Sequence, residues 1–518
     1  MLRAPATARR SRPRARGACL ATTDTTAPPP RFTDLLGHPR PLWMLFMTEF
    51  WERFAFYGMR WALTLYIVAQ FFGGDAAGQG YASRTYGAFL ALVYAMAIFG
   101  GYVADRLIGY QRSILLGAAI SAVGYFTIVL PQQQIFLLGL ATIIVGNGLF
   151  KPNISTLVGQ LYAPGDARRD RGFTIFYMGI NLGALVSPLL TGWLASVISG
   201  TPLVQNYKAV FVATGIGMAI SMLWFWFGRH RLQGIGRSPQ GRNGTAMLGW
   251  VVAGAVAAVP VVYLLMAEVG AGVLAWILGA LFVALALMLL IEALREGGVA
   301  RDKVTAMLLL FAFNVLFWMF FEQAGSSFNF LAQNLVDRRL LGWEFPVGWF
   351  QSVNPAAIVI LAPLVALAWG WLGARGREPS IPRKFGLGLL FNALAFLLLM
   401  YALKSLVGSN GQIPFWPLVL VYVLQTVGEL SLSPIGLSMV TKLAPLRYVG
   451  LAMGGWFLST AIGNNLSGIF AGHVSGERGM TVASALQGFT FSFWLLLGAA
   501  ALLLLIAPRI SRLMHGVR

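Results

Sequence analysis

The chain has 518 residues, of which 57% are hydrophobic and only 11% are charged, and its mean hydropathy is +0.71. These values exclude a soluble domain and are typical of a helical protein that crosses a membrane many times. A formal net charge of +20 suggests a nucleic-acid partner, but most Lys and Arg residues lie in the tails and in alternate loops. This positive-inside pattern instead predicts cytoplasmic termini, a lipid bilayer with anionic headgroups as the partner, and no nucleic-acid partner.

The first 40 residues are rich in Arg, Pro, Thr and Ala and contain the single cysteine, Cys19. One cysteine excludes an intrachain disulfide and a Cys-based metal site. The segment lacks the continuous apolar region and the cleavage site of a secretory signal. We therefore predict that residues 1–40 form a disordered basic cytoplasmic tail, and that the protein is a multi-pass component of the cell inner membrane.

Hydropathy predicts fourteen membrane-spanning helices after this tail. We divide them into an N-terminal six-helix bundle (41–230), a cytoplasmic linker with two extra helices (231–300), a C-terminal six-helix bundle (301–512) and a cytoplasmic tail (513–518). The two central helices contain almost no polar residues, so we expect a lipid-facing hairpin with no part in the chemistry. Both bundles have polar residues within their membrane segments, as expected for a substrate pathway between them.

The first predicted helix carries charges in the middle of an apolar segment, within the sequence EFWERFAFYGMRW (49–61). At about 100° per residue, one face of this helix collects its polar side chains. On that face Glu49 and Arg53 are four residues apart and can form an ion pair. Each charge placed centrally in a membrane costs about 2.5–3.5 kcal/mol on insertion scales, so this face must contact a polar interior. A substrate or proton pathway is the favoured interpretation, and a structural ion-pair network is the alternative.

This segment resembles the first-helix signature of the proton-dependent oligopeptide transporter family, a branch of the major facilitator superfamily. The matching residues are Glu49, Glu52, Arg53, Phe54, Tyr57, Gly58 and Arg60. Phe56 departs from the pattern, because many members have a tyrosine there. The resemblance implies an all-α polytopic membrane protein with the major facilitator fold, made of two six-helix bundles and here with two extra central helices. It also implies a transporter and not an enzyme.

Further segments of the N-terminal half fit the same family. The loop GGYVADRLIGYQRS (100–113) loosely resembles a charged loop of the superfamily. Lys151, in GNGLFKPNI, matches a Lys-Pro-Asn element, and Tyr177 and Asn181 match a signature of the fifth helix. A lysine that extends to the membrane surface and a tyrosine that only packs are the alternatives at these positions.

The C-terminal half contains isolated polar residues in otherwise apolar helices. Glu322 and Gln323 are surrounded by aromatic residues that include Trp318 and Phe321, and Asn354 precedes a proline. Glu429 matches the acidic position of the family's tenth-helix element, with Ser433 one turn further on. Trp456 is a core residue by composition alone, but the resemblance implies that it forms a wall of the binding pocket.

Together these residues predict a proton-coupled symporter that imports di- and tripeptides by alternating access. Cations in one bundle and an acid in the other suit the two ends of a short peptide, with the peptide carboxylate on Arg60 and Lys151 and its amine on Glu429 and Asn354. The other expected substrate-binding residues are Tyr57, Tyr94, Tyr177, Asn181, Trp318, Phe321, Gln323, Ser433 and Trp456.

For proton coupling, we expect Glu49 and Glu52 to pair with Arg53 and Lys151 when ionised, so that protonation frees Lys151 for the peptide. The resemblance suggests that Arg60 and Glu322 pair to close the outer side. We expect no cofactor other than the coupling proton, no catalytic or metal site, and function as a monomer. Symport of another solute, such as nitrate or a metabolite, and an uncoupled facilitator remain as alternatives.

Overall fold

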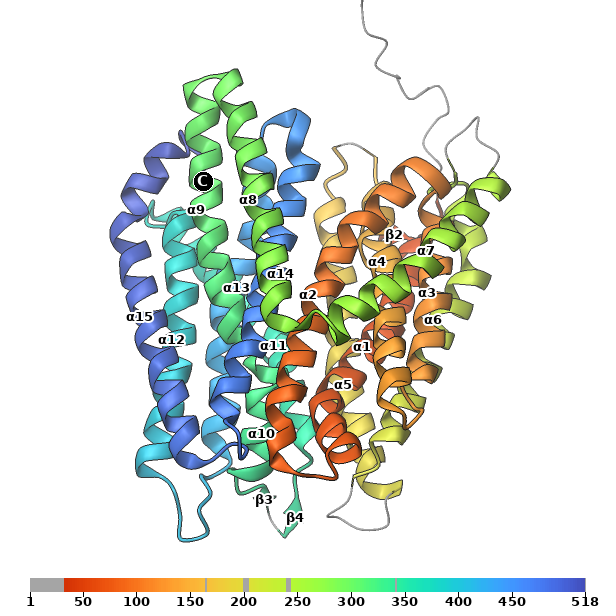
Figure 1. The fold of residues 1–518 in the computed structure, drawn as a ribbon. Helices are drawn as coiled ribbons and strands as arrows, with labels where there is room; N and C mark the ends of the chain where they lie inside the picture. The colour runs from red at the N-terminus through yellow and green to blue at the C-terminus, as the bar shows by residue number, and fades with distance from the viewer. Residues whose placement is uncertain (1–31, 164, 199–204, 239–243, 341, 518) are drawn as a thin grey trace, which may run out of the picture.

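The computed structural model describes residues 32–163, 165–198, 205–238, 244–340 and 342–517, which are almost entirely α-helical (Figure 1). Its fourteen long helices agree in number with the fourteen that hydropathy predicts. Of the predicted tail, residues 1–31 lie outside the described residues. The strands β1 (Asp34–Leu35) and β2 (His38–Pro39) form an antiparallel hairpin that the sequence did not predict.

The first six long helices form one bundle in which small residues permit close packing. A Cβ atom on Gly117 would lie 2.5 Å from the carbonyl oxygen of Gly146, so the two helices that carry these glycines approach backbone to backbone. Three short turns join the helices, namely η1 (Ala76–Gly78), the π-turn η2 (Ala104–Ile108) and η3 (Arg229–Leu232). The long helices are α1 (Arg40–Phe71), α2 (Gln79–Val103), α3 (Tyr110–Thr127), α4 (Gln133–Gln160), α5 (Arg169–Ile198) and α6 (Tyr207–Gly228).

The β1–β2 hairpin is attached to the loop between α4 and α5. His38 Nδ1 lies 2.8 Å from the hydroxyl of Tyr162, and Arg168 forms ion pairs with Asp34 and Asp166 at 2.9 Å each. The hydrogen bonds from Arg168 hold the pKa of the Asp166 carboxyl below its ordinary value. These contacts fix where the chain enters α1.

The last six membrane segments form the second bundle, in which the seventh segment is broken. We expected a single membrane-spanning helix at the start of the C-terminal bundle (301–512), but the structure divides this segment into α9 (Gly298–Phe321), the turn η4 (Glu322–Gly325) and α10 (Ser327–Asn334). The turn frees the carbonyls of Ala324 and Gly325, which accept hydrogen bonds from Gln351 and Asn329. The remaining elements are β3 (Arg339–Leu340), β4 (Trp343–Glu344), η5 (Val347–Ser352), α11 (Val353–Ala374), α12 (Ile381–Ser405), α13 (Trp416–Leu443), η6 (Leu446–Tyr448), α14 (Val449–Ser475) and α15 (Val482–Leu513).

The two extra helices, α7 (Gly244–Ala267) and α8 (Gly270–Glu296), lie across the outside of both bundles (Figure 1). α7 packs against α4, whereas α8 packs against α14 and α9. Asn465 of α14 donates a hydrogen bond of 2.7 Å to the carbonyl of Ala271 at the start of α8. Trp250 and Trp276 are 76% and 82% exposed, so this hairpin presents an apolar surface.

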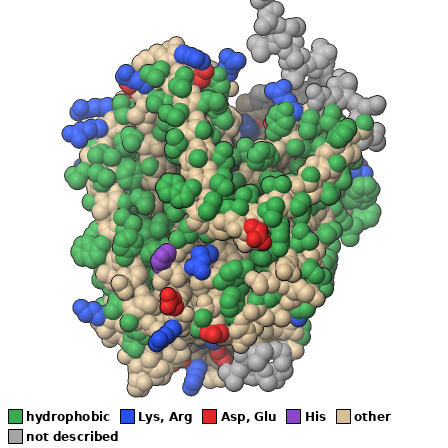
Figure 2. Space-filling model, viewed as in Figure 1, with side chains coloured by type: hydrophobic (Ala, Val, Ile, Leu, Met, Phe, Trp, Pro, Cys, Tyr) green, Lys and Arg blue, Asp and Glu red, His purple; other side chains and the backbone are tan. Residues whose placement is uncertain are grey.

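The molecule has two ends, which we call the terminal face and the opposite face. The described chain begins and ends at the terminal face, while the β3–β4 hairpin lies at the opposite face (Figure 1). Figure 2 shows hydrophobic side chains over the flank between them and Lys and Arg side chains along the edge of the terminal face. Among the described residues, eleven helical segments are long and apolar enough to cross a membrane by length and composition.

Several hydrogen bonds join the two bundles toward the opposite face. Ser352 Oγ donates to the carbonyl of Leu185 at 2.8 Å, and Trp349 Nε1 donates to that of Leu189 at 2.9 Å. The amide of Met480 donates to Gln79 Oε1 at 2.8 Å. At the other end of α5, toward the terminal face, Tyr177 and Met178 are 39% and 46% exposed. The bundles are therefore joined at the opposite face, whereas Tyr177 stays partly exposed nearer the terminal face.

Candidate functional site

The acids of α1 are held by one arginine and one amide. Arg53 Nε lies 3.1 Å from Glu49 Oε1 and also donates to Glu52 Oε2. Asn147 of α4 donates to Glu52 Oε1 at 2.8 Å. All four side chains are buried, so the predicted Glu49–Arg53 pair is present inside the bundle and not at a surface.

Lys151 lies close to this cluster but does not pair with its acids. Its ammonium sits 4.2 Å from the centre of the Tyr94 ring. In the part of the chain that the structure describes, it forms no ion pair within 4.0 Å. The expected direct pairing of Lys151 with Glu49 and Glu52 is thus not formed in this conformation. Arg53 pairs with these acids instead, because on the same helix it is adjacent to Glu52 and one turn after Glu49.

A second ion pair joins the two bundles. Arg60 Nη2 of α1 lies 2.5 Å from Glu322 Oε2 of η4, as the resemblance suggested. Arg60 Nε also donates to the hydroxyl of Tyr86 on α2, at 2.6 Å. That hydroxyl lies 3.5 Å from Glu322 Oε2. Three elements from both halves of the chain therefore meet at one guanidinium.

The acid of the second bundle has a polar partner from a neighbouring helix. Asn354 Nδ2 of α11 donates to Glu429 Oε2 of α13 at 2.9 Å and lies 2.9 Å from Thr426 Oγ1. Ser433, one turn after Glu429, has a buried hydroxyl without a hydrogen-bond partner in the described structure. These groups offer a carboxylate, an amide and a hydroxyl on one side of the space between the bundles.

Aromatic side chains surround these polar groups. The Arg60 guanidinium lies 5.5 Å from the centre of the Tyr57 ring, and Trp318 packs edge-on against Phe321 with their centres 5.2 Å apart. Tyr177 is partly exposed, and Asn181 Nδ2 donates to its backbone carbonyl at 2.9 Å. The cavity between Arg60 and Asn354 is small, about 20 Å³, which is room for about one water molecule.

Two predicted substrate-binding residues are directed away from this space. Both ends of the Gln323 amide are engaged inside the second bundle, with Ser467 and Ser327. Trp456 is only 4% exposed and packs between Phe311 and Phe385. In this conformation, packing within the second bundle already satisfies both side chains, and their contact with substrate stays a prediction.

Other residues of the site were not predicted. Phe457, next to Trp456, faces Tyr94 of the first bundle with ring centres 6.5 Å apart. Gln351 and Tyr422 line the central cavity, and Tyr86 and Asn147 hold the charged groups. Asn147 lies within the segment GNGLFKPNI, one turn before Lys151. A polar residue at this spacing from Lys151 could have indicated that Asn147 belongs to the site. Tyr86 and Gln351 had no such signal, because only the packing of separate helices brings them here.

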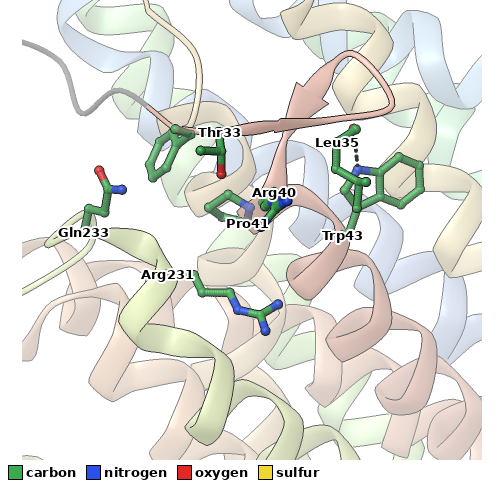
Figure 3. Close-up of a pocket in the computed structure, with 8 residues that line it drawn as sticks. Thr33, Leu35, Arg40, Pro41, Trp43, Arg231 and Gln233 are labelled. Atoms are coloured by element: carbon green, nitrogen blue, oxygen red, sulfur yellow. Dashed lines mark hydrogen bonds between the residues drawn. The ribbon is translucent and has the colours of Figure 1, made fainter.

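The cavity shown in Figure 3 lies apart from this site, at the terminal face. It has a volume of about 370 Å³ and is lined by residues of the entry hairpin, α1 and η3. Arg40 and Arg231 contribute its positive charge, and Trp43 Nε1 donates to the carbonyl of Leu35 at 2.9 Å. None of the predicted site residues lines it. The candidate site is therefore the charged space between the bundles.

Comparison with known proteins gives a consistent result. Residues 111–483 match the family model described as the POT family. The chain is 36% identical over 96% of its length to the peptide transporter YePEPT of Yersinia enterocolitica, and the match covers 99% of that protein. It is also 36% identical to dipeptide and tripeptide permease B of Photorhabdus luminescens, over 86% of this chain and 90% of that one.

The fold resembles solved structures of the same kind. A crystal structure of the peptide transporter POT in complex with sulfate superposes with a TM-score of 0.79. The two proteins share 33% sequence identity, and the match covers 93% of this chain and 97% of the other.

Proposed function

Because this chain belongs to the POT family, we propose that it imports di- and tripeptides together with protons by alternating access. Relatives named as peptide transporters and as dipeptide and tripeptide permeases support this substrate class. The positive-inside pattern supports a cytoplasmic terminal face in the cell inner membrane. In that orientation, the described conformation is closed to the outside.

The observation that carries the proposal is the separation of charge across the site. Arg60 and Lys151 lie on the first bundle, whereas Glu429 and its partner Asn354 lie on the second. A short peptide has a carboxylate at one end and an ammonium at the other, so it satisfies both walls at once. Exposed Tyr177 and the Trp318–Phe321 pair provide contacts that adapt to different side chains.

Proton coupling is proposed for the first bundle. The site contains four carboxylates and three permanently or readily charged cations, so it carries one excess negative charge when all are ionised. One proton neutralises this excess. The carboxylates are those of Glu49, Glu52, Glu322 and Glu429, and the cations are Arg53, Arg60 and Lys151. In our proposal, ionised Glu49 and Glu52 attract Lys151 as well as Arg53, and protonation of an acid on α1 weakens that attraction and leaves Lys151 for the peptide carboxylate.

The Arg60–Glu322 ion pair is proposed as the outer gate. A buried ion pair between two bundles stabilises the closed state only while both groups stay charged and in contact. Protonation of Glu322, or capture of Arg60 by the peptide carboxylate, removes the pair. Either event lets the bundles separate at the opposite face.

The test is uptake of labelled dialanine into proteoliposomes, with and without an inwardly directed proton gradient. We expect the gradient to drive accumulation in the wild type. We expect Glu429→Gln to reduce accumulation at least tenfold, because the amide loses the charge that binds the peptide ammonium.

Glu477→Gln is the matched control. It makes the same chemical change in an exposed residue of the loop before α15, far from the site. Proton-driven uptake of another solute, such as nitrate, without dialanine transport would contradict the peptide substrate. Dialanine uptake that equilibrates but never accumulates would identify an uncoupled facilitator.

A further inference from the structure

A basic pocket lies at the terminal face beside the first bundle. Its volume is about 490 Å³, and its walls include Arg112 at the start of α3, Arg229 and His230 of η3, and Arg237 after it. No Asp or Glu is among the described residues that line it. The described lining of the pocket therefore carries three arginines and one histidine.

The pocket is built by fixed contacts and not by loose surface side chains. Ser238 Oγ donates to the carbonyl of Ile108 at 2.8 Å and accepts from Arg112 Nη1 at 3.0 Å. Gln111 Nε2 donates to the carbonyl of Ile235 at 2.6 Å. The segment after η3 is thus docked on the turn between α2 and α3.

Gly109 makes this docking possible. Its φ angle is +81°, and a Cβ atom there would lie 2.6 Å from the carbonyl carbon of Arg237. Any other residue would push the segment away from the turn and open the pocket.

An apolar groove continues directly from the pocket along the flank of the protein. It has a volume of about 650 Å³ and runs between α3, α6 and α7. Arg112 and Arg229 border both spaces, so they mark the junction. Below them the groove is lined by apolar side chains, including Leu116, Ala119, Met222 and Val252.

Arg229 is held at this junction by an aromatic side chain. Its guanidinium lies 3.8 Å from the centre of the Trp226 ring. Trp226 and the neighbouring Phe227 are 50% and 69% exposed at the end of α6. Exposed aromatic residues at a helix end are typical of the level of lipid headgroups.

We propose that this pocket and groove bind one anionic phospholipid of the leaflet on the terminal face. Its phosphate lies among Arg112, Arg229 and Arg237, and an acyl chain fills the groove between α3, α6 and α7. Basic pockets between membrane helices are suited to anionic headgroups, and a continuous apolar groove distinguishes a lipid from a free anion. Because α7 forms one wall, the lipid joins the extra hairpin to the first bundle. The proposal does not depend on the transported substrate.

The test uses the full chain, purified and depleted of lipid in detergent, and titrated with phosphatidylglycerol or phosphatidylcholine during native mass spectrometry. We expect phosphatidylglycerol to bind at least tenfold more tightly. We expect Arg112→Gln and Arg229→Gln each to weaken its binding about fivefold. Ala119→Trp, which fills the groove and leaves every arginine in place, should also weaken it about fivefold.

Two variants serve as controls. Arg231→Gln removes the same charge from the same turn, but Arg231 lines the separate cavity of Figure 3. Arg375→Gln removes an arginine that also stacks on a tryptophan, 3.6 Å from the centre of the Trp371 ring, and Arg375 lines neither the basic pocket nor the apolar groove. Both should change phosphatidylglycerol binding less than twofold.

Equal binding of the two lipids would overturn the proposal, as would a loss with Arg231→Gln equal to that with Arg229→Gln. Inorganic phosphate that competes fully with phosphatidylglycerol at equal concentration would show that only an anion site is present. If the arginine variants do not fold, the lipid comparison on the wild type and Ala119→Trp decides the question.

Discussion

Arg60 illustrates how one side chain can serve two purposes in this site. Its guanidinium pairs with Glu322, donates to Tyr86 and lies over Tyr57. Because the planar guanidinium has five donors in fixed directions, it can be held by the protein on one edge and still offer another edge to a carboxylate. Tyr86 holds one of those edges, so we assign it a positioning role.

We predict that Tyr86→Phe impairs the gate and leaves the peptide site intact. Loss of a hydrogen bond to a charged group costs about 1.5–3 kcal/mol. Proton-driven dialanine uptake should therefore fall at least fivefold in maximal rate, while the peptide concentration at half-maximal rate changes less than twofold.

Tyr81→Phe is the control on the same helix, because the Tyr81 hydroxyl accepts a hydrogen bond only from exposed Gln133 in the described structure. Equal losses in the two variants would show that Tyr86 has no special connection to Arg60.

The pairing of α2 with α14 decides how closely the bundles meet. A Cβ atom on Gly87 would lie 2.7 Å from Gly468 Cα and 2.8 Å from the carbonyl oxygen of Asn464. Both obstacles are backbone atoms, which cannot move aside without shifting a helix. The absence of a side chain at Gly87 is therefore a requirement of the conformation that is closed at the opposite face.

We predict that Gly87→Ala destabilises this closed conformation by about 1–3 kcal/mol. The measurement is the rate of disulfide formation between cysteines introduced at Leu185 and Ser352, in a Cys19→Ser background. The Ser352 hydroxyl donates a hydrogen bond to the backbone carbonyl of Leu185 where the two bundles meet. The rate should fall severalfold.

Gly101→Ala provides the comparison within α2, since a Cβ atom there meets nothing within 4 Å. An unchanged cross-linking rate in Gly87→Ala would mean that the helices adjust to the added methyl group without opening.

At the scale of the whole molecule, the proposed transport requires that the acids of α1 and the peptide site act on the same pair of bundles. The cluster of Glu49, Glu52 and Arg53 lies within the first bundle, whereas the Arg60–Glu322 pair joins the two. Lys151 and Tyr94 lie beside that cluster. In the proposed mechanism, a change of charge in the first bundle alters the Arg60–Glu322 contact that joins the two bundles.

We predict that the double variant with Glu49→Gln and Glu52→Gln keeps dialanine exchange and loses dialanine accumulation. Counterflow of dialanine without a proton gradient should persist, because the peptide contacts remain. Accumulation driven by a proton gradient should be lost, because no acid remains on α1 to take up the proton.

Glu268→Gln, at the exposed end of the central hairpin, should leave both activities unchanged. Undiminished accumulation in the double variant would contradict a coupling role for the α1 acids.

The sequence by itself determined the membrane class, the fourteen helices and the family, because hydropathy and motif spacing are properties of a continuous segment. It also identified Glu49, Arg53, Arg60, Glu322 and Glu429 as charged groups that a membrane interior has to accommodate.

Only the tertiary structure decided which side chains meet. It placed Tyr86 and Asn147 on the charged groups, directed Gln323 and Trp456 into the second bundle, and broke the seventh membrane segment at η4. These outcomes depend on how helices rotate and cross, and competition between packing and hydrogen bonding across separate helices sets those angles. The residue pattern of one helix therefore cannot predict these contacts.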